Sequence, residues 1–560
     1  MAVKKKKKKG LGGGAFSGSS RSREQSPLRP QYIEKLPPCR NACPSGNRIR
    51  EFVTTIAQAE RLEKPSEQAF REAWEIYTDT SPFPAVCGRV CPHPCEDNCN
   101  RNELDAPVNI NKIERAIGDF GLENKLELKT LSEEKRPEKI AVVGGGPGGL
   151  SCAYQLARRG YGVTVFEADD KPGGMLLWGI PRYRLPADVL EGEIGKILDL
   201  GVELKCDTRV GEDVSLEDLR SQYQAVFVSI GAQKGLKLRV EGEEADNVFS
   251  GVEFLSRIHH GEKIDVGDDV IVVGGGDTAI DAARICKRLG ANVTILYRRT
   301  IKEMPAIDEE IEEAQTEGIR LEYLAAPIGF NRQDSRITSM KCIRMELGEP
   351  DDSGRRRPVP IEGSEFEIPA TAVIPAISQE PDFTGLETLI EDRDWIRVDQ
   401  RGESTKVEGV YAGGDAVSLA LVTTAIGQGR RAAEAIDRKL RGEEEPPDSQ
   451  MPLIQTDRMR LDHYEKAERA QAGSLPVEQR LAALETEVNL PISQQQAIEE
   501  ARRCMSCGFC FDCEKCWLFC QDQAVEKPMQ KGVLYTFKLQ NCTGCKKCAE
   551  ECPCGFIDML

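Results

Sequence analysis

The chain has 560 residues, 40% of them hydrophobic and 30% charged, and its formal net charge at pH 7 is −17. This length is enough for about three or four domains with separate cores, and the acidic balance argues against nucleic acid as a main partner. No apolar run approaches the ~18 residues of a membrane-spanning helix. We therefore expect a cytoplasmic protein built from several globular domains.

The chain opens with a basic block. Six consecutive lysines, Lys4–Lys9, precede Gly- and Ser-rich sequence without the apolar stretch of a signal peptide. Blocks of like charge are most often solvated, so we expect residues 1–36 to form a disordered basic arm. An electrostatic tether to an acidic partner or to a membrane surface is the alternative. Residues 37–136 then carry six cysteines on a helical, charged background.

Residues 137–265 begin with a nucleotide-binding pattern. A β-branched strand leads into Gly144-x-Gly146-x-x-Gly149 and a helical segment, and a second strand ends at Glu167. The glycines let the backbone approach a pyrophosphate at the helix N-terminus, and an acid about 20 residues further on binds ribose hydroxyls. Because strand, helix, second strand and acid are all in register, the motif predicts FAD or NAD.

Residues 266–371 repeat this unit with two changes. Ala279 replaces the third glycine, and the second strand ends in Arg298 and Arg299 instead of an acid. Two guanidinium groups suit a 2′-phosphate, so the unit is predicted to bind NADP(H). A surface basic patch, or NADH held by looser recognition, is the alternative. The predicted NAD(P)H-binding residues are Gly274, Gly276, Asp277, Ala279, Arg298 and Arg299.

Residues 372–442 contain a third motif, a strand that ends in Gly413-Gly414-Asp415 and a helix that begins near Gln428. A carboxylate at a strand end and a helix N-terminus could hold a polar ligand. The order of the three motifs resembles the flavoprotein oxidoreductases that have two dinucleotide-binding domains. That resemblance implies an α/β fold in which a Rossmann-like NAD(P) domain is inserted in a Rossmann-like FAD domain.

A more specific resemblance comes from the segment Gly173 to Pro186. It is similar to the GGxL…GIPxxRLP signature of the glutamate synthase small-subunit family, and Tyr297-Arg298-Arg299 followed by Met304-Pro305 also matches. The resemblance covers about residues 37 to 442 and implies FAD contacts from several motif residues. These residues are Gly144, Gly146, Gly149, Glu167, Gly174, Met175, Arg184, Gly231, Asp415 and Gln428.

The cysteines of residues 37–136 resemble those of the helical domain that precedes the flavin domain in glutamate synthase small subunits and in dihydropyrimidine dehydrogenase. That domain binds two [4Fe–4S] clusters. Matching position by position implies that one cluster is held by Cys43, Cys91, Cys95 and Glu114. Cys87 matches a family cysteine that is not a ligand.

Residues 443–503 are Gln/Glu/Ala-rich after an acidic start and are predicted to form a helical linker. Residues 504–560 hold eleven of the 21 cysteines. Two runs there match the bacterial ferredoxin pattern, in which three thiolates hold one cube and the fourth reaches the other cube. The predicted ligands are Cys510, Cys513, Cys516 and Cys552 for one [4Fe–4S] cluster, and Cys542, Cys545, Cys548 and Cys520 for its neighbour. Structural zinc and disulfides are poorer matches.

Cys504 and Cys507 lie in an RCxxCG element just before the ferredoxin runs, and the ferredoxin pairing leaves both unused. In the resembled family this element precedes the first helical-domain cysteine, and here it is absent from that position. We hypothesise that Cys504 and Cys507 fold back to complete a cluster with Cys39 and Cys99. The alternative is that they are spare or bind a separate metal.

The cofactor motifs predict an NAD(P)H:acceptor oxidoreductase with FAD and about four [4Fe–4S] clusters, and no hydrolytic machinery is visible. Residues 504–560 and the displaced RCxxCG element resemble the DsrL-type iron–sulfur flavoproteins of dissimilatory sulfur metabolism. That resemblance implies dissimilatory sulfite reductase as the redox partner, and ferredoxin is the other candidate partner. The alternatives are a glutamate synthase small subunit, a ferredoxin:NADP reductase, or a non-catalytic electron-wiring subunit. The sequence leaves open the direction of flow and whether the chain forms a homodimer.

Overall fold

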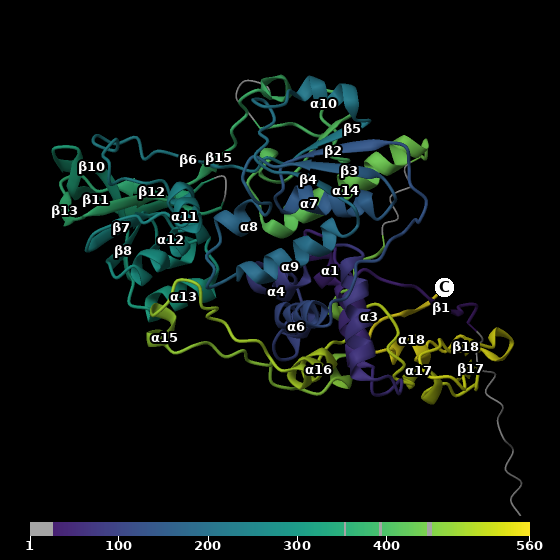
Figure 1. Cartoon of the computed structure of the whole chain (residues 1–560). Helices are drawn as coiled ribbons and strands as arrows, with labels where there is room; N and C mark the ends of the chain where they lie inside the picture. The colour runs from purple at the N-terminus through teal and green to yellow at the C-terminus, as the bar shows by residue number, and fades with distance from the viewer. Residues whose placement is uncertain (1–25, 352–353, 391–394, 445–450) are drawn as a thin grey trace, which may run out of the picture.

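Two parallel β-sheets with helices packed against them make up most of the structure, and a helical domain and a small cysteine-rich domain lie beside them (Figure 1). The computed structural model describes residues 26–351, 354–390, 395–444 and 451–560. The predicted lysine-rich block therefore lies outside the described residues. No helix in the described part of the chain is both long and apolar enough to cross a membrane. The predicted α/β class with two Rossmann-like domains is confirmed.

The first Rossmann-like unit has a five-stranded parallel sheet in the order β16-β5-β2-β3-β4. Its strands are β2 (Lys139–Val143), β3 (Gly162–Phe166), β4 (Glu203–Lys205), β5 (Ala225–Val228) and β16 (Val410–Ala412). Its helices are α7 (Pro147–Ala157), α8 (Met175–Trp178), α9 (Ala187–Leu198), α10 (Leu216–Gln222) and α14 (Val422–Arg441). The inner strands are continuous apolar runs, as parallel strands between helix layers require. A Cβ on Gly429 would stand 2.1 Å from the Gly148 oxygen, so α14 packs directly on α7.

The second unit combines a four-stranded parallel sheet, in the order β14-β7-β8-β9, with an antiparallel sheet. The parallel strands are β7 (Asp269–Val273), β8 (Asn292–Tyr297), β9 (Arg320–Tyr323) and β14 (Ala372–Pro375). The antiparallel strands are β10 (Ala325–Gln333), β11 (Arg336–Pro350), β12 (Arg356–Pro360) and β13 (Phe366–Pro369). The helices are α11 (Gly251–His259), α12 (Asp277–Arg288) and α13 (Asp308–Thr316).

The chain passes between the two units at residues that differ from the sequence prediction. The flavin unit was expected to resume at residue 372, but β14 pairs in parallel with β7, so that boundary is wrong. Helix α11, expected in the flavin unit, buries Phe254 and Leu255 in the core of the second unit. A two-stranded ladder of β6 (Lys234–Gly235) and β15 (Gln379–Glu380) joins the crossing segments. A buried apolar strand of four residues, such as β14, is compatible with either parallel sheet. Only its pairing with β7 shows which sheet it joins.

The N-terminal domain consists of helices whose core is continuous with that of the first unit. These helices are α1 (Pro38–Ala42), α2 (Ile49–Ala57), α3 (Ser66–Thr78), α4 (Pro84–Val90), α5 (Pro94–Asp97) and α6 (Ile110–Glu123). A Cβ on Gly118 of α6 would stand 2.2 Å from the Ala85 nitrogen, so α4 and α6 cross almost backbone to backbone. This crossing holds Cys91, which caps the end of α4, in a fixed position relative to Glu114 on α6.

The C-terminal domain contains α17 (Lys515–Leu518), α18 (Lys547–Glu550), β17 (Val525–Glu526), β18 (Thr536–Phe537) and β19 (Ile557–Met559). Strand β19 pairs with β1 (Pro30–Tyr32) from the opposite end of the chain. The Tyr32 ring stacks on Phe556 with centroids 4.9 Å apart, and the Tyr32 hydroxyl donates to the Tyr535 carbonyl (2.8 Å). A disordered arm reaching residue 36 is therefore wrong for residues 30–36. No local pattern marks this strand, because its partner is so distant in sequence.

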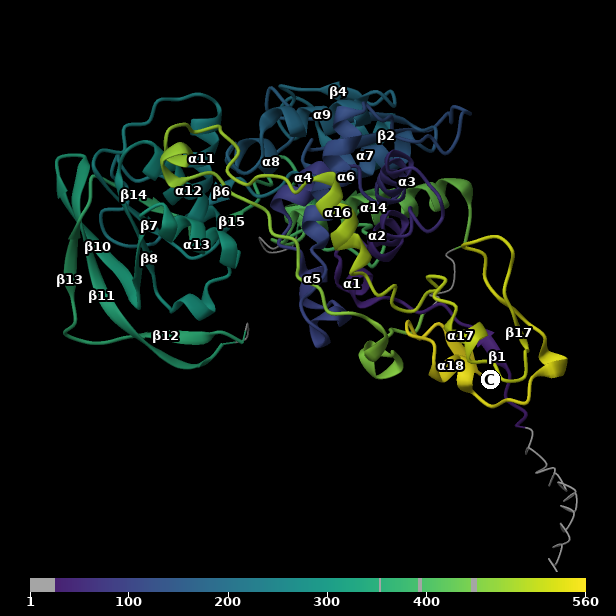
Figure 2. The ribbon, with the colours of Figure 1, turned by 90° about the horizontal axis from the view of Figure 1, so that it is seen from below.

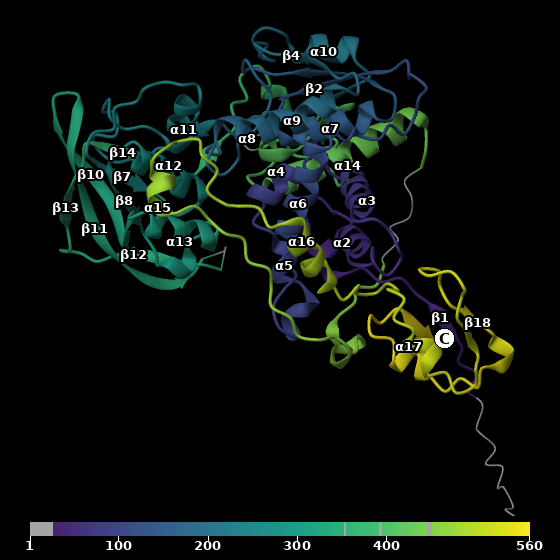
Figure 3. The same ribbon diagram turned by 60° about the horizontal axis from the view of Figure 1, so that its bottom comes forward.

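Residues 451–503, which we call the strap, run across the molecule and touch three domains (Figures 2 and 3). The strap carries α15 (Val477–Leu481) beside the second unit and α16 (Gln494–Arg502) against α2 and α6. Its remaining residues are mostly irregular, with two short 3₁₀ helices (Thr456–Arg458 and Leu461–His463), so the prediction of a helical linker holds only in part. Backbone groups of the strap bond to the domains it crosses, as where the Val488 N–H donates to the Tyr183 carbonyl (2.9 Å).

Candidate functional site

The first glycine motif lies at the carboxyl edge of the first sheet and lines a cavity of about 410 Å³. Gly144 has φ +102°, and a Cβ on Gly149 would stand 1.9 Å from the Gly144 oxygen, so the turn excludes side chains at both positions. The Gly145 N–H donates to Glu167 Oε2 (2.7 Å), and burial raises the pKa of Glu167. The predicted flavin residues that line the cavity are Gly144, Gly146, Glu167, Gly174, Met175, Gly231 and Asp415.

Two predicted flavin residues have other contacts. Gln428 accepts a hydrogen bond from the Gly414 N–H (2.6 Å), so it supports the turn that presents Asp415. Arg184 does not line the cavity: its guanidinium pairs with Asp281 (2.8 Å) and Glu310 (3.0 Å) in the second unit. The arginine of the RLP segment therefore ties the two units together, a role that the sequence prediction missed.

Sequence reasoning also missed two side chains that line this first cavity, Trp178 and Arg209. Trp178 stacks on His260 with ring centroids 3.9 Å apart. Arg209 pairs with Asp382 (2.8 Å). Trp178 lies two residues after the GGxL segment, which could have signalled it, whereas Arg209 lies in a loop without any motif.

The second glycine motif lines a cavity of about 650 Å³ together with Arg298, Arg299 and Arg355. Arg298 is exposed, whereas Arg299 is 4% exposed. The Arg299 guanidinium donates to Asp351 (2.6 Å) and to the Arg356 carbonyl (2.7 Å), so it is already engaged by the β11–β12 hairpin. The two predicted arginines therefore have different roles: Arg298 is exposed at the cavity, whereas Arg299 is held by the hairpin. Arg355 at the hairpin was not predicted, because it comes from a strand connection outside the Rossmann pattern.

The remaining residues predicted for this nucleotide site support its turn. Gly274 and Gly276 line the cavity. Asp277 accepts a hydrogen bond from the Ile307 N–H (3.0 Å), and Ala279 is fully buried in the core of the unit. Asp277 and Ala279 themselves do not line the cavity.

The two cavities meet. Val252, Asp415 and Ala420 line both of them, so a ligand in the second cavity can reach a ligand in the first without crossing a layer of protein. Asp415 therefore lies where the two nucleotides would come together. Burial raises its pKa, and its carboxylate accepts a hydrogen bond from the Ala420 N–H (3.1 Å).

Cys43, Cys91, Cys95 and Glu114 converge next to the first unit, and we call this group the Glu114 site. Burial raises the pKa of each thiol, and the neighbouring Glu114 carboxylate raises it further. Burial, followed by the charge of Glu96, raises the pKa of Glu114 to about 8. The His93 N–H points at the Cys91 sulfur (3.3 Å), as backbone donors do around iron–sulfur ligands.

Cys39, Cys99, Cys504 and Cys507 surround a small cavity of about 30 Å³, and we call this group the split site. Burial raises the pKa of Cys39, and the three other thiols raise it further. Burial also raises the pKa of Cys504 to about 11. The structure therefore brings the two leftover cysteines to the N-terminal pair, although they are far apart in sequence.

The C-terminal thiols form two groups in the pairing that the ferredoxin pattern predicts. Burial raises the pKa of Cys516, with further contributions from Cys510, Cys513 and Cys552. Around the second group, burial raises the pKa of Cys548 to about 12, and Cys542, Cys520 and Cys545 add to it. In each run a backbone N–H points at the first sulfur, from Asp512 to Cys510 and from Gly544 to Cys542 (both 3.4 Å).

No group of three or more Cys, His, Asp or Glu side chains within the described residues is drawn together tightly enough for a single metal ion. A four-iron cube holds its ligand sulfurs further apart than one zinc ion does. The grouping of the thiols and the backbone donors aimed at sulfur fit such cubes.

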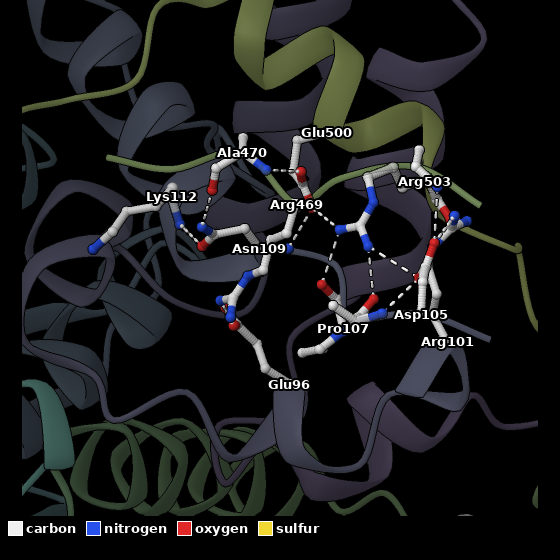
Figure 4. Close-up of polar contacts among 12 residues, drawn as sticks. Glu96, Arg101, Asp105, Pro107, Asn109, Lys112, Arg469, Ala470, Glu500 and Arg503 are labelled. Carbon is white, nitrogen blue, oxygen red and sulfur yellow. Dashed lines mark hydrogen bonds and ion pairs between the residues drawn. The ribbon is translucent and has the colours of Figure 1, made fainter. Parts of the chain in front are cut away.

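Polar contacts tie the strap to the N-terminal domain next to the split site (Figure 4). Glu500 accepts a hydrogen bond from the Asn109 N–H (2.7 Å) and pairs with Arg503 (2.6 Å). Arg503 in turn pairs with Asp105 of the N-terminal domain (3.1 Å). Glu500 and Arg503 are 1% and 4% exposed, so these contacts are sealed from water. Cys504, the next residue, is thereby held against the N-terminal domain.

Comparison with known proteins matches residues 138–429 to the family model of pyridine nucleotide-disulphide oxidoreductases. The chain belongs to this family. Residues 33–126 match the model of dihydropyrimidine dehydrogenase domain II, 4Fe-4S cluster. The predicted class, an FAD- and iron–sulfur-dependent NAD(P)H oxidoreductase with [4Fe–4S] clusters, is confirmed.

Three relatives extend this result. The chain is 37% identical over 519 residues to NADPH-Fe(3+) oxidoreductase subunit beta of Geobacter sulfurreducens, covering 85% of this chain and 76% of the relative. It is 35% identical to the glutamate synthase [NADPH] small chain of Escherichia coli, covering 71% and 88%. It is 40% identical to the NADP(+)-dependent formate dehydrogenase subunit beta of Moorella thermoacetica, covering 72% and 60%. The chain is thus a glutamate synthase small-subunit-like oxidoreductase.

Proposed function

We propose that this oxidoreductase takes electrons from NADPH and passes them through FAD and four [4Fe–4S] clusters to a separate protein. The observation that carries the proposal is a continuous series of sites. Asp415 lines both nucleotide cavities, and groups of cysteine thiols continue from the first unit to the C-terminal domain. Bound FAD would accept a hydride and release its two electrons singly. One NADPH then reduces two one-electron acceptors and leaves NADP⁺ and one proton.

The chain's own residues supply position and shielding in this scheme. Glu167 would bind the flavin ribose, and Arg298, with Arg355 beside it, would bind the 2′-phosphate of NADPH. The Glu114 site would be the first cluster beyond the flavin. The split site would connect it to the two C-terminal clusters, and Cys545, the exposed ligand, would mark the exit.

For the partner we propose dissimilatory sulfite reductase. The support is the likeness of residues 504–560 and the displaced RCxxCG element to DsrL-type proteins, in which the ferredoxin domain follows the flavin domains. The glutamate synthase large subunit is the second candidate, favoured by the coverage of 88% of the Escherichia coli small chain. That the matched relatives from Geobacter and Moorella are named as subunits supports a role within an assembly.

The test uses the full chain purified without oxygen. NADPH should bleach both flavin and cluster absorption, and the protein should then reduce an artificial one-electron dye. Purified sulfite reductase and glutamate synthase large subunit are offered in turn as acceptors, each in its own assay. NADPH-dependent turnover with sulfite reductase supports the proposed partner, and turnover only with the large subunit transfers the assignment. Flavin bleaching without cluster bleaching would contradict the relay.

A further inference from the structure

Helix α17 and its C-terminal cap expose three consecutive large apolar side chains on the C-terminal domain. Trp517, Leu518 and Phe519 are 41%, 65% and 41% exposed. A run of exposed apolar residues gains nothing from burial in the folded chain, and contiguous apolar surface marks a site of interaction. The domain lies at the edge of the molecule, away from the two Rossmann-like units, where a second protein can reach it (Figures 2 and 3).

A cavity of about 490 Å³ lies beside this apolar run. Cys513, Lys527 and Met529 are among the residues that line it. The Lys527 ammonium lies 5.3 Å from the centre of the Trp517 ring, so the cavity and the apolar run are neighbours. The side chains that make up this continuous region, which we call the α17 surface, are Trp517, Leu518, Phe519, Lys527 and Met529.

The α17 surface is flanked by predicted ligands of both C-terminal clusters. Cys513 lines the cavity, and Cys520 directly follows Phe519 in the chain. Helix α17 also contacts α18, which begins two residues after Cys545. A protein docked on the α17 surface would therefore lie against the end of the proposed relay.

The charged groups at the α17 surface favour an acidic partner. Arg61 pairs with Asp512 (3.2 Å) and with Glu514 (3.3 Å). Lys527 also pairs with Glu514 (2.9 Å), and Lys515, at the start of α17, has no carboxylate within 4 Å in the described part of the chain. Cations therefore outnumber carboxylates here, although the whole chain carries a net charge of −17. A second copy docked symmetrically would bring these cations together, which like-charge repulsion disfavours.

Resting on the proposed function, we propose that the electron-accepting protein docks on the α17 surface through a face with an apolar centre and carboxylates at its rim. Trp517 and Leu518 fill that centre, because aromatic and large apolar side chains form the cores of protein interfaces and dominate their energetics. Lys515 and Lys527 face the carboxylates, which makes association sensitive to salt. A small artificial dye needs no such face, so docking can be separated from the relay itself.

The experiment changes the α17 surface in the full chain purified without oxygen. Leu518→Gln removes apolar contact, Leu518→Met keeps it, and Lys527→Gln removes one positive charge. Leu131→Gln is the matched control, because Leu131 is also exposed (51%) but lies between α6 and β2. Iron per FAD and bleaching by NADPH are measured first, to show that each variant holds its cofactors.

The acceptor is purified dissimilatory sulfite reductase, or the glutamate synthase large subunit if only that protein gives turnover. Its Kd is measured at two ionic strengths, together with KM in NADPH-driven turnover. We expect Leu518→Gln to raise Kd and KM about tenfold, whereas Leu518→Met and Leu131→Gln should match the wild type. Lys527→Gln should weaken binding at low salt and reduce its dependence on salt.

Three results would overturn the inference. Wild-type Kd in both Leu518→Gln and Lys527→Gln would place the docking face elsewhere and leave the proposed function intact. A wild type that binds neither acceptor would contradict the proposed function's partner, and the inference with it. Self-association, or binding to vesicles of anionic lipid, that Leu518→Gln abolishes would assign the α17 surface to a second copy or to a membrane instead.

Discussion

The division of roles between Arg298 and Arg299 gives the sharpest prediction. Arg298 is exposed at the second cavity, whereas Arg299 is buried and paired with Asp351. If Arg298 binds the 2′-phosphate, Arg298→Gln removes a charge-assisted contact of about 1.5–3 kcal/mol. At about 1.4 kcal/mol per tenfold, kcat/KM for NADPH should fall roughly 10- to 150-fold. NADH lacks the phosphate, so its kcat/KM should stay near the wild-type value.

The assay is steady-state dye reduction with NADPH and with NADH at one ionic strength, because phosphate contacts are sensitive to salt. Arg299→Gln is the companion variant. It should lower stability by loosening the β11–β12 hairpin, and it should change both cofactors' kcat/KM by a similar factor. Equal losses with NADPH and NADH in Arg298→Gln would refute the assignment, because the residue would then act on a part shared by both cofactors.

Three further results are expected. Cys504→Ala should lower the iron content from about sixteen to about twelve atoms per FAD. Cys554 lies outside the predicted ligand sets, so Cys554→Ala should keep the iron content of the wild type. Equal iron content in both variants would exclude the split cluster. Arg503→Met leaves the buried Glu500 carboxylate without its counter-charge, and chemical denaturation should show a loss of about 3–5 kcal/mol. Burial raises the pKa of Glu193 to about 8, so the folded state holds an extra proton between about pH 4.5 and 8. Unfolding free energy should therefore fall as pH rises through that window, and Glu193→Gln should flatten the slope; an unchanged slope would contradict it.

Features set by neighbouring residues could be predicted from the sequence. The turns at Gly144 and Gly274 need positive φ angles and close approach of the backbone. The spacing of the glycines in each motif predicts both requirements. The grouping of the C-terminal thiols likewise follows from the short intervals within each cysteine run. Glu167, at the end of the second strand, is placed by the same register.

Features set by distant partners could not be predicted in this way. Arg184 lies in a recognisable motif, yet its function is decided by Asp281, which approaches only when the second unit docks on the first. Gln428 supports Gly414 through one hydrogen bond that no spacing encodes.

The pairing of β1 with β19 bears on how such proteins can exchange parts in evolution. The cysteine runs of residues 504–560 look like a ferredoxin cassette that a gene fusion could add or remove. Yet Tyr32 fills part of its core, and Lys35 donates to the Gly555 carbonyl (2.7 Å). Transplanting this segment alone would leave behind one strand of its sheet and half of the split site. Its gain or loss therefore requires matched changes in two segments that are far apart in the gene.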